Sequence, residues 1–173
     1  MTIFFIVFIL HWYLSLFSQT FFLHRYAAHS MFRMNAFWEK FFYFFTWITQ
    51  GSSYLSPYAY GILHRLHHAF TDTENDPHSP SYTKGLFPLM WKTKQIYGDI
   101  NSDKFPVDDK FMKNLPMWRS FDRFVSSFGI RIAWGVIYFL FYLAFATQWW
   151  MWLLFPITCL MGPVHGAIIN YFA

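Results

Sequence analysis

Two long stretches without a formal charge limit what this chain can fold into more than any other feature. Residues 2–23 contain no Lys, Arg, Asp or Glu, and neither do residues 132–173. About 20 apolar residues in a helix span a bilayer, so the first stretch has the length of one span and the second that of two. A soluble domain of 173 residues could not bury a chain that is 55% hydrophobic and 25% aromatic. The sequence therefore predicts an all-α membrane protein, with residues 1–173 as one domain.

The predicted transmembrane helices cover about residues 3–23, 132–147 and 150–169, and the last two form a hairpin. The first stretch lacks the basic start and the small-residue cleavage site of a signal peptide, so we expect it to be retained. All 13 Lys and Arg residues lie between Arg25 and Arg131. Because basic residues favour the cytoplasmic side of a membrane, the middle of the chain is predicted to be cytoplasmic.

A further apolar segment, residues 37–54, is predicted to form an interfacial helix rather than a crossing. A crossing would place the basic residues before and after it on opposite faces of the membrane, against the charge bias. Gly51 and Pro57 mark its end. Residues 56–129 are predicted to form a cytoplasmic helical cap, because most acids, prolines and lysines fall within residues 71–129.

The net charge of +4 does not indicate binding to nucleic acid, because the basic residues are dispersed and form no arginine cluster. Anionic lipid head groups or an anionic substrate match this charge better. The single cysteine, Cys159, lies in an apolar run, which excludes an intrachain disulfide and a thiolate metal site. Any metal must be bound through nitrogen or oxygen.

Five histidines fall in two short motifs, HRYAAH at residues 24–29 and HRLHH at residues 64–68. In the second motif the histidines stand at i, i+3 and i+4, which places them on one face of a helix. In the first motif they are five residues apart, about 140° around an α-helix, so they need not share one ion and could serve two. Two ions would explain the demand for so many imidazoles. The candidate metal ligands are His24, His29, His64, His67 and His68.

A single histidine is more often a hydrogen-bonded structural residue than a ligand. We expect this of His11, within the first span, and the same explanation competes with a functional role for His165. For the two motifs, a purely structural role would require both to fall by chance at the same depth in the membrane and on the same side of it. Ionisable groups at a membrane boundary are costly and usually functional, so metal binding is favoured.

The residues around the motifs narrow the choice of metal. An all-imidazole set suits iron, copper, zinc or nickel. The only glutamates, Glu39 and Glu74, are not in the Glu-x-x-His pairs of soluble di-iron bundles. No HExxH motif indicates zinc hydrolysis. A redox metal is therefore the favoured interpretation.

Together the two motifs resemble a known family. HRYAAH and HRLHHAFTDTENDPHSP are similar to the first two histidine boxes of the membrane fatty acid desaturases, especially the acyl-CoA Δ9 type. HGAIINYFA, residues 165–173, resembles the segment in which an asparagine precedes a further histidine by four positions. The resemblance implies that Asn170 contacts one iron through a water.

The resemblance also implies a reaction. Two iron ions would activate O₂ and introduce a cis double bond into an acyl chain. No flavin or nicotinamide motif is visible, so electrons would come from a separate ferredoxin or cytochrome b5 type carrier with its reductase. The residues that bind the acyl substrate cannot be selected among 24 Phe, 11 Tyr and 9 Trp.

The family pattern leads to a further expectation about the chain, and two alternative functions stay open. The family continues with another histidine and a third histidine box, so we expect this chain to be C-terminally incomplete and inactive when expressed alone. A hydroxylase or ketolase of the same histidine-box superfamily remains an alternative function. An inactive membrane fragment, whose histidines bind no specific metal, is the other alternative.

Overall fold

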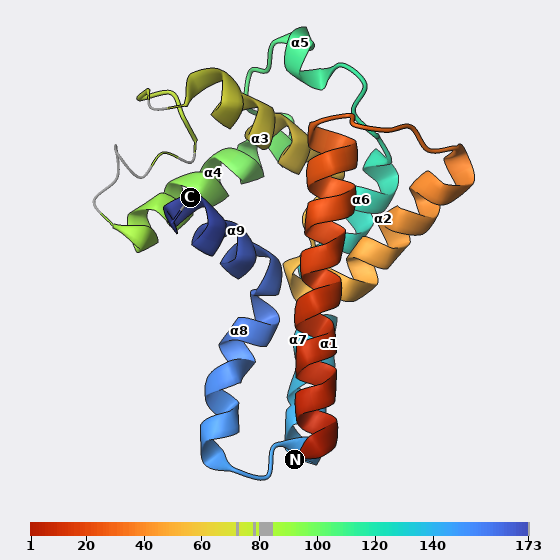
Figure 1. Cartoon of the computed structure of the whole chain (residues 1–173), viewed down its shortest axis with the longest axis vertical. Coiled ribbons are helices and arrows are strands. Elements are labelled where there is room, and N and C mark those ends of the chain that lie inside the picture. Colours follow the sequence, from red (N-terminus) through yellow and green to blue (C-terminus); the bar gives the residue numbers. More distant parts are fainter. Residues whose placement is uncertain (72, 78, 80–84, 173) are drawn as a thin grey trace.

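The computed structural model describes residues 1–71, 73–77, 79 and 85–172, with side chains described as far as Gly166. Within these residues all regular secondary structure is helical. Long apolar helices extend to one end of the molecule, and shorter helices gather at the other end (Figure 1). The prediction of an all-α membrane protein is confirmed.

The first candidate transmembrane helix changes its winding partway along. Helix α1 (Thr2–Phe17) continues without a break into η1 (Ser18–Ala28), and together they make 27 residues that are long and apolar enough to cross a bilayer. The η1 segment is a π-helix, in which each N–H donates to the carbonyl five residues earlier. The last such bond runs from the N–H of His29 to the carbonyl of His24, at 3.0 Å. This wider winding determines where the first pair of histidines points.

The second long apolar helix is α7 (Phe128–Phe145), which covers most of the predicted span over residues 132–147. It packs against α1 and then turns back at the far end of the molecule (Figure 1). The following stretch, predicted as one helix over residues 150–169, differs from that expectation. It consists of three short helices in succession: η4 (Trp149–Leu154), α8 (Phe155–Cys159) and α9 (Met161–Phe172).

A proline explains the break between α8 and α9. In a continuous helix, residue 163 would donate its N–H to the carbonyl of Cys159, but Pro163 has no N–H. The hydroxyl of Ser52 donates to that carbonyl instead, at 2.7 Å. Ser52 belongs to the turn η2 (Gly51–Ser53), so the break also attaches the last helices to the centre of the molecule.

Helix α2 (Ala36–Gln50) lies at an angle to α1 (Figure 1). The side chain of Asn35 caps its start by accepting from the N–H of Trp38 at 3.0 Å. Its 15 residues reach about 22 Å, less than the ~30 Å hydrocarbon core. Apolar side chains on one side are exposed, including Phe37, Trp38 and Phe41. These features suit the interfacial helix expected over residues 37–54, which stays a prediction.

Four helices form the cap around the end of η1: α3 (Pro57–Phe70), α4 (Leu86–Asn101), α5 (Asp109–Met112) and α6 (Arg119–Val125). Helix α3 begins where the Ser56 hydroxyl accepts from the N–H of Ala59 and Pro57 occupies the first turn. One side of α3 packs into a core with α4 and α5, through Ile62, Leu66, Ile100 and Phe111 among others. The other side carries the histidines.

A buried carboxylate joins the cap to the membrane helices. Asp122 of α6 is completely buried and accepts from the hydroxyl groups of Tyr54 at 2.7 Å and Ser56 at 2.9 Å. Arg131, at the start of α7, donates to the carbonyls of Ser52 and Tyr54. The connection that leads into α3 is therefore held from two sides.

Candidate metal centre

Four of the predicted ligands meet at the cap end of the first candidate transmembrane helix. The Nε2 atom of His29 lies 3.2 Å from Nε2 of His24 and 3.0 Å from Nε2 of His64. Nε2 of His64 lies 3.0 Å from Nε2 of His68. The ligand atoms of His24, His29 and His64 all lie within 4.8 Å of one another. Two helices distant in sequence, η1 and α3, thus direct their imidazoles to one place.

These separations suit a shared metal ion. Imidazole nitrogens bind first-row metal ions at about 2.1 Å, so two of them at right angles around one six-coordinate ion lie about 3.0 Å apart. The observed values of 3.0 and 3.2 Å match that geometry. The residues present therefore fit a metal centre bound through nitrogen.

The placement of His24 and His29 differs from the expectation drawn from an α-helix. In an α-helix the two side chains would lie about 140° apart around the helix axis, so that they need not share one ion and could serve two. His24 lies in η1 and His29 directly follows this segment, and the N–H of His29 still donates to the carbonyl of His24 five residues earlier, so the two rings meet. The two histidines can share an ion because this segment is a π-helix.

His67 is held differently from the other four. Its Nδ1 lies 2.8 Å from the Oδ1 of Asp76, a carboxylate that is 1% exposed. A carboxylate on one ring nitrogen fixes the tautomer and orients the other nitrogen, here Nε2, for a metal. The ring centroid of His67 lies 5.6 Å from that of His68, so a second ion beside the first could use it.

Sequence reasoning gave no role to Asp76, although it lies in the TDTENDPHSP segment that follows the second motif. Its acidic type and its position eight residues after His68 are the only signals, and neither reveals burial. Asn170 lies in helix α9, but its side chain is outside the described residues. Its predicted water-mediated contact with iron stays a prediction.

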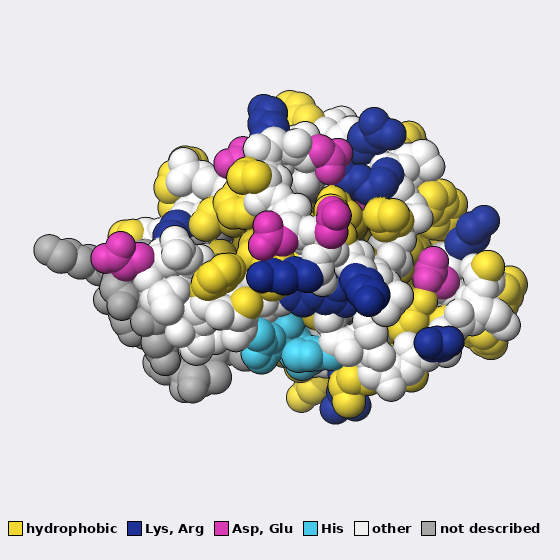
Figure 2. Space-filling model, turned by 90° about the horizontal axis from the view of Figure 1, so that it is seen from above, with side chains coloured by type: hydrophobic (Ala, Val, Ile, Leu, Met, Phe, Trp, Pro, Cys, Tyr) yellow, Lys and Arg dark blue, Asp and Glu magenta, His cyan; other side chains and the backbone are white. Residues whose placement is uncertain are grey.

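The site is open to the surface. Side chains of His29 and His68 are exposed, and His24, His64 and His67 are half-buried. Figure 2 shows histidines in one patch beside a group of Lys and Arg side chains. Partial burial, with smaller contributions from the positive charges of His68 and Arg65, lowers the pKa of His29. A neutral imidazole is the form that binds a metal.

The other two described histidines lie away from this cluster. In the membrane part, Nε2 of His11 lies 3.4 Å from the hydroxyl of Tyr138, the structural contact expected of it. His165 is 3% exposed and packs edge-on against Trp12, with ring centroids 4.4 Å apart. Neither lies in the groups of His, Cys, Asp and Glu that converge on one place within the described residues.

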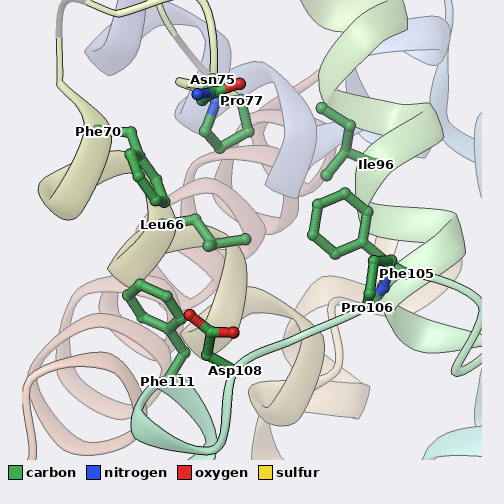
Figure 3. A pocket seen from close by; sticks show the side chains of 9 residues that line it. All are labelled: Leu66, Phe70, Asn75, Pro77, Ile96, Phe105, Pro106, Asp108 and Phe111. Atoms are coloured by element: carbon green, nitrogen blue, oxygen red, sulfur yellow. The ribbon is translucent and has the colours of Figure 1, made fainter.

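A separate pocket of about 230 Å³ lies beside α3, on the side of that helix that does not carry the histidines; Figure 3 shows the residues that line it. Leu66 and Phe70 line it from that helix, and Asn75 and Pro77 line it from the loop that carries Asp76. The pocket is therefore distinct from the histidine cluster, although the two share a loop.

A comparison with known protein families is consistent with the histidine cluster described above. The model of the family described as "Fatty acid desaturase" matches residues 1–173. This chain belongs to the fatty acid desaturase family. In this desaturase family member, the two histidine motifs meet at one place on the cap.

Two curated relatives from Arabidopsis thaliana are similar over shorter regions. The "Delta-9 desaturase-like 5 protein" is 41% identical over 64 residues, which is 36% of this chain and 20% of the relative. "Delta-9 acyl-lipid desaturase 1" is 35% identical over 68 residues, which is 39% of this chain and 21% of the relative. The matched regions thus cover about a fifth of each relative. No solved structure matches the chain.

We expect replacement of Asp76 with alanine to weaken metal binding by about tenfold to a hundredfold, because His67 would lose the carboxylate that orients its ring. Titration of the metal-free protein with Co²⁺, followed by absorption, measures this. Glu74→Ala, an exposed position in the same loop, is the control and should bind as the wild type does. Equal affinity in the Asp76 variant would remove the carboxylate from the site.

Proposed function

We propose that the protein introduces a cis double bond into a fatty acyl chain, with O₂ as the oxidant and two iron ions as the cofactor. The observation that carries this proposal is the convergence of imidazoles from η1 and α3 in a fatty acid desaturase family member. The proposed iron ligands are His24, His29, His64, His67 and His68, with Asn170 acting through a water. When bound, the two ions would supply the oxidising chemistry.

The protein's own residues hold and orient these groups. Four imidazoles at separations of 3.0 to 3.2 Å present nitrogen donors that need little rearrangement. Asp76 fixes the ring of His67 through Nδ1. The two long apolar helices keep this assembly at a bilayer, where an acyl chain is available.

We propose a Δ9 position for the double bond and an acyl-CoA substrate. Both relatives carry Δ9 in their names, which supports the position. Basic side chains beside the histidines favour an anionic head group such as that of a coenzyme A ester (Figure 2). The name of one relative specifies an acyl lipid instead, so acyl lipid is the alternative substrate.

The reduction of O₂ to water requires four electrons, and the acyl chain supplies only two of them. The other two must come from a separate electron donor. We propose a ferredoxin or cytochrome b5 type carrier with its reductase as their source. The metal centre is proposed to face the cytoplasm, since every Lys and Arg lies between Arg25 and Arg131. Labelling of a cysteine placed at Lys113 from outside intact cells would contradict that orientation.

The test is a product assay with the whole protein in membranes. A labelled saturated acyl-CoA or acyl lipid is supplied with the carrier, its reductase and O₂, and products are identified by mass spectrometry. A product that has lost two hydrogens at carbons 9 and 10 is the expected result. A product that has gained oxygen would identify the hydroxylase or ketolase alternative. No product and no bound iron would identify an inactive protein.

A further inference from the structure

Arg65 lies inside the second motif, next to His64, and makes an unusual set of contacts. All five N–H donors of its guanidinium group form hydrogen bonds. The Nε atom donates to the carbonyl of Ala28 at 2.7 Å, and the two terminal nitrogens donate to four other acceptors. Such a complete set indicates a residue that determines how segments fit together.

Two of these contacts are made with the end of η1. The last carbonyls of a helix have no partner within the helix, and Arg65 donates to those of Ala27 and Ala28. It also donates to the hydroxyl of Ser30, at 3.2 Å. Ser30 has a φ of 51°, a conformation that is costly for a residue other than glycine. The arginine therefore stabilises both the end of the π-helix and the turn after it.

The remaining contacts reach a third segment. One terminal nitrogen of Arg65 donates to the carbonyls of Phe111 at 3.0 Å and Lys113 at 2.7 Å, where α5 ends. Arg65 thus joins α3, η1 and α5 through a single planar group. Close packing nearby reinforces this, because a Cβ added to Gly61 would lie only 2.5 Å from Leu115 and 3.5 Å from the carbonyl of Ala27.

Arg65 and its partners are next to the candidate metal ligands along the chain. His64 directly precedes Arg65, and His29 directly follows Ala28, whose carbonyl makes one of the two shortest bonds. The 3.0 Å separation between Nε2 of His64 and Nε2 of His29 therefore depends on the relative position of two helices joined one residue away. Metal centres tolerate displacements of only about 0.5 Å.

We propose that Arg65 is a positioning residue for the metal centre. It holds the end of η1 against α3 so that the histidines of the two motifs are already in register before a metal binds. This inference rests on the proposed metal centre, and it assigns Arg65 no contact with the metal or the substrate.

Lysine cannot replace this function. It has the same charge, but it carries three donors on one flexible nitrogen, whereas the guanidinium group carries five in a fixed plane. Arg65→Lys therefore keeps the charge and removes the geometry. The matched control is Arg119→Lys, because Arg119 also binds the cap backbone, donating to the carbonyl of Asn101 at 2.7 Å, and lies over the ring of Tyr58.

The experiment has two readouts. Spin labels on cysteines placed at the exposed residues Met31 and Ala69, in a chain with Cys159→Ser, report the distance between the two motifs in the metal-free protein. Titration with Co²⁺ reports the affinity of the site. We expect Arg65→Lys to shift or broaden the distance distribution and to weaken Co²⁺ binding about tenfold or more. Arg119→Lys should change neither, and both variants should keep their helical circular dichroism.

A wild-type distance and affinity in Arg65→Lys would overturn the proposal, as would equal losses in Arg119→Lys. If Arg65→Lys does not fold, Ser30→Ala decides, since it removes one of the five bonds and leaves the arginine in place. It should weaken Co²⁺ binding about twofold to fivefold, the usual effect of one hydrogen bond, and an unchanged affinity would overturn the proposal. If the wild type binds no Co²⁺, the proposed metal centre fails, while the distance measurement still decides on Arg65.

Discussion

Replacement of His64 with alanine is expected to abolish the proposed acyl desaturation in the whole protein and to weaken metal binding by more than about a hundredfold. His64 lies at the contact between the two motifs, since its Nε2 lies 3.0 Å from Nε2 of His29 and 3.0 Å from Nε2 of His68. Its loss removes the nitrogen of the second motif that lies nearest to the first motif. Membrane insertion should be unchanged, because the apolar helices are untouched. Iron content and product formation measure the two effects.

The matched control is His11→Ala. His11 lies in α1, and its contact is the hydroxyl of Tyr138 rather than another histidine of the cluster. We expect its activity to stay close to that of the wild type. Near-normal turnover in the His64 variant would remove that residue from the ligands, and a His11 variant as damaged as His64→Ala would show that His11 has more than a structural role.

Replacement of Asp122 with alanine is expected to lower the free energy of unfolding by about 3 kcal/mol, because the buried hydroxyls of Tyr54 and Ser56 would lose their acceptor. Thermal unfolding of the purified protein in detergent measures this. Asp109→Ala is the control, since Asp109 is exposed, and its stability should equal that of the wild type. A stable Asp122 variant would mean that the connection before α3 does not depend on this carboxylate.

Asp122 also gives a pH dependence with a definite sign. Burial is the main cause that raises its pKa, and hydrogen bonds from Tyr54 and Ser56 offset part of the effect. Because the folded-state pKa lies above the unfolded value, its contribution to stability is greatest at low pH and is lost as the pH rises through the folded-state pKa. Asp122→Asn should remove this dependence. An unchanged pH profile in that variant would assign the dependence to another group.

The sequence predicted the helical membrane fold and five candidate ligands because both depend on local patterns. Charge-free stretches of sufficient length indicate spans, and imidazoles at i, i+3 and i+4 indicate one helix face. The structure places four of the five candidates together and orients His67 by a carboxylate. The break after Cys159 could have been anticipated from Pro163, whose missing N–H removes a hydrogen bond that a continuous helix would make to Cys159.

The contributions of Arg65 and Asp76 could not be predicted in this way. Each of them contacts residues that are close in space but do not stand at a fixed spacing along the chain. Arg65 donates to carbonyls 37, 38, 46 and 48 positions away. A basic residue between two histidines looks like any solvent-exposed charge until the fold brings helix ends to it. The type and spacing of residues identify candidate ligands, whereas the residues that position them follow from tertiary contacts.

The π-helical winding of η1 has a consequence for how such sites are recognised and altered. Two histidine pairs reach nearly the same nitrogen separation from different spacings: His24 and His29, five apart across the end of η1, at 3.2 Å, and His64 and His68, four apart in α3, at 3.0 Å. Spacing and winding are thus interchangeable variables. Deleting one residue between the first pair should therefore be tolerated if the segment rewinds as an α-helix, because four residues of an α-helix turn through nearly the same angle as five residues of a π-helix and would keep the second histidine beside His24.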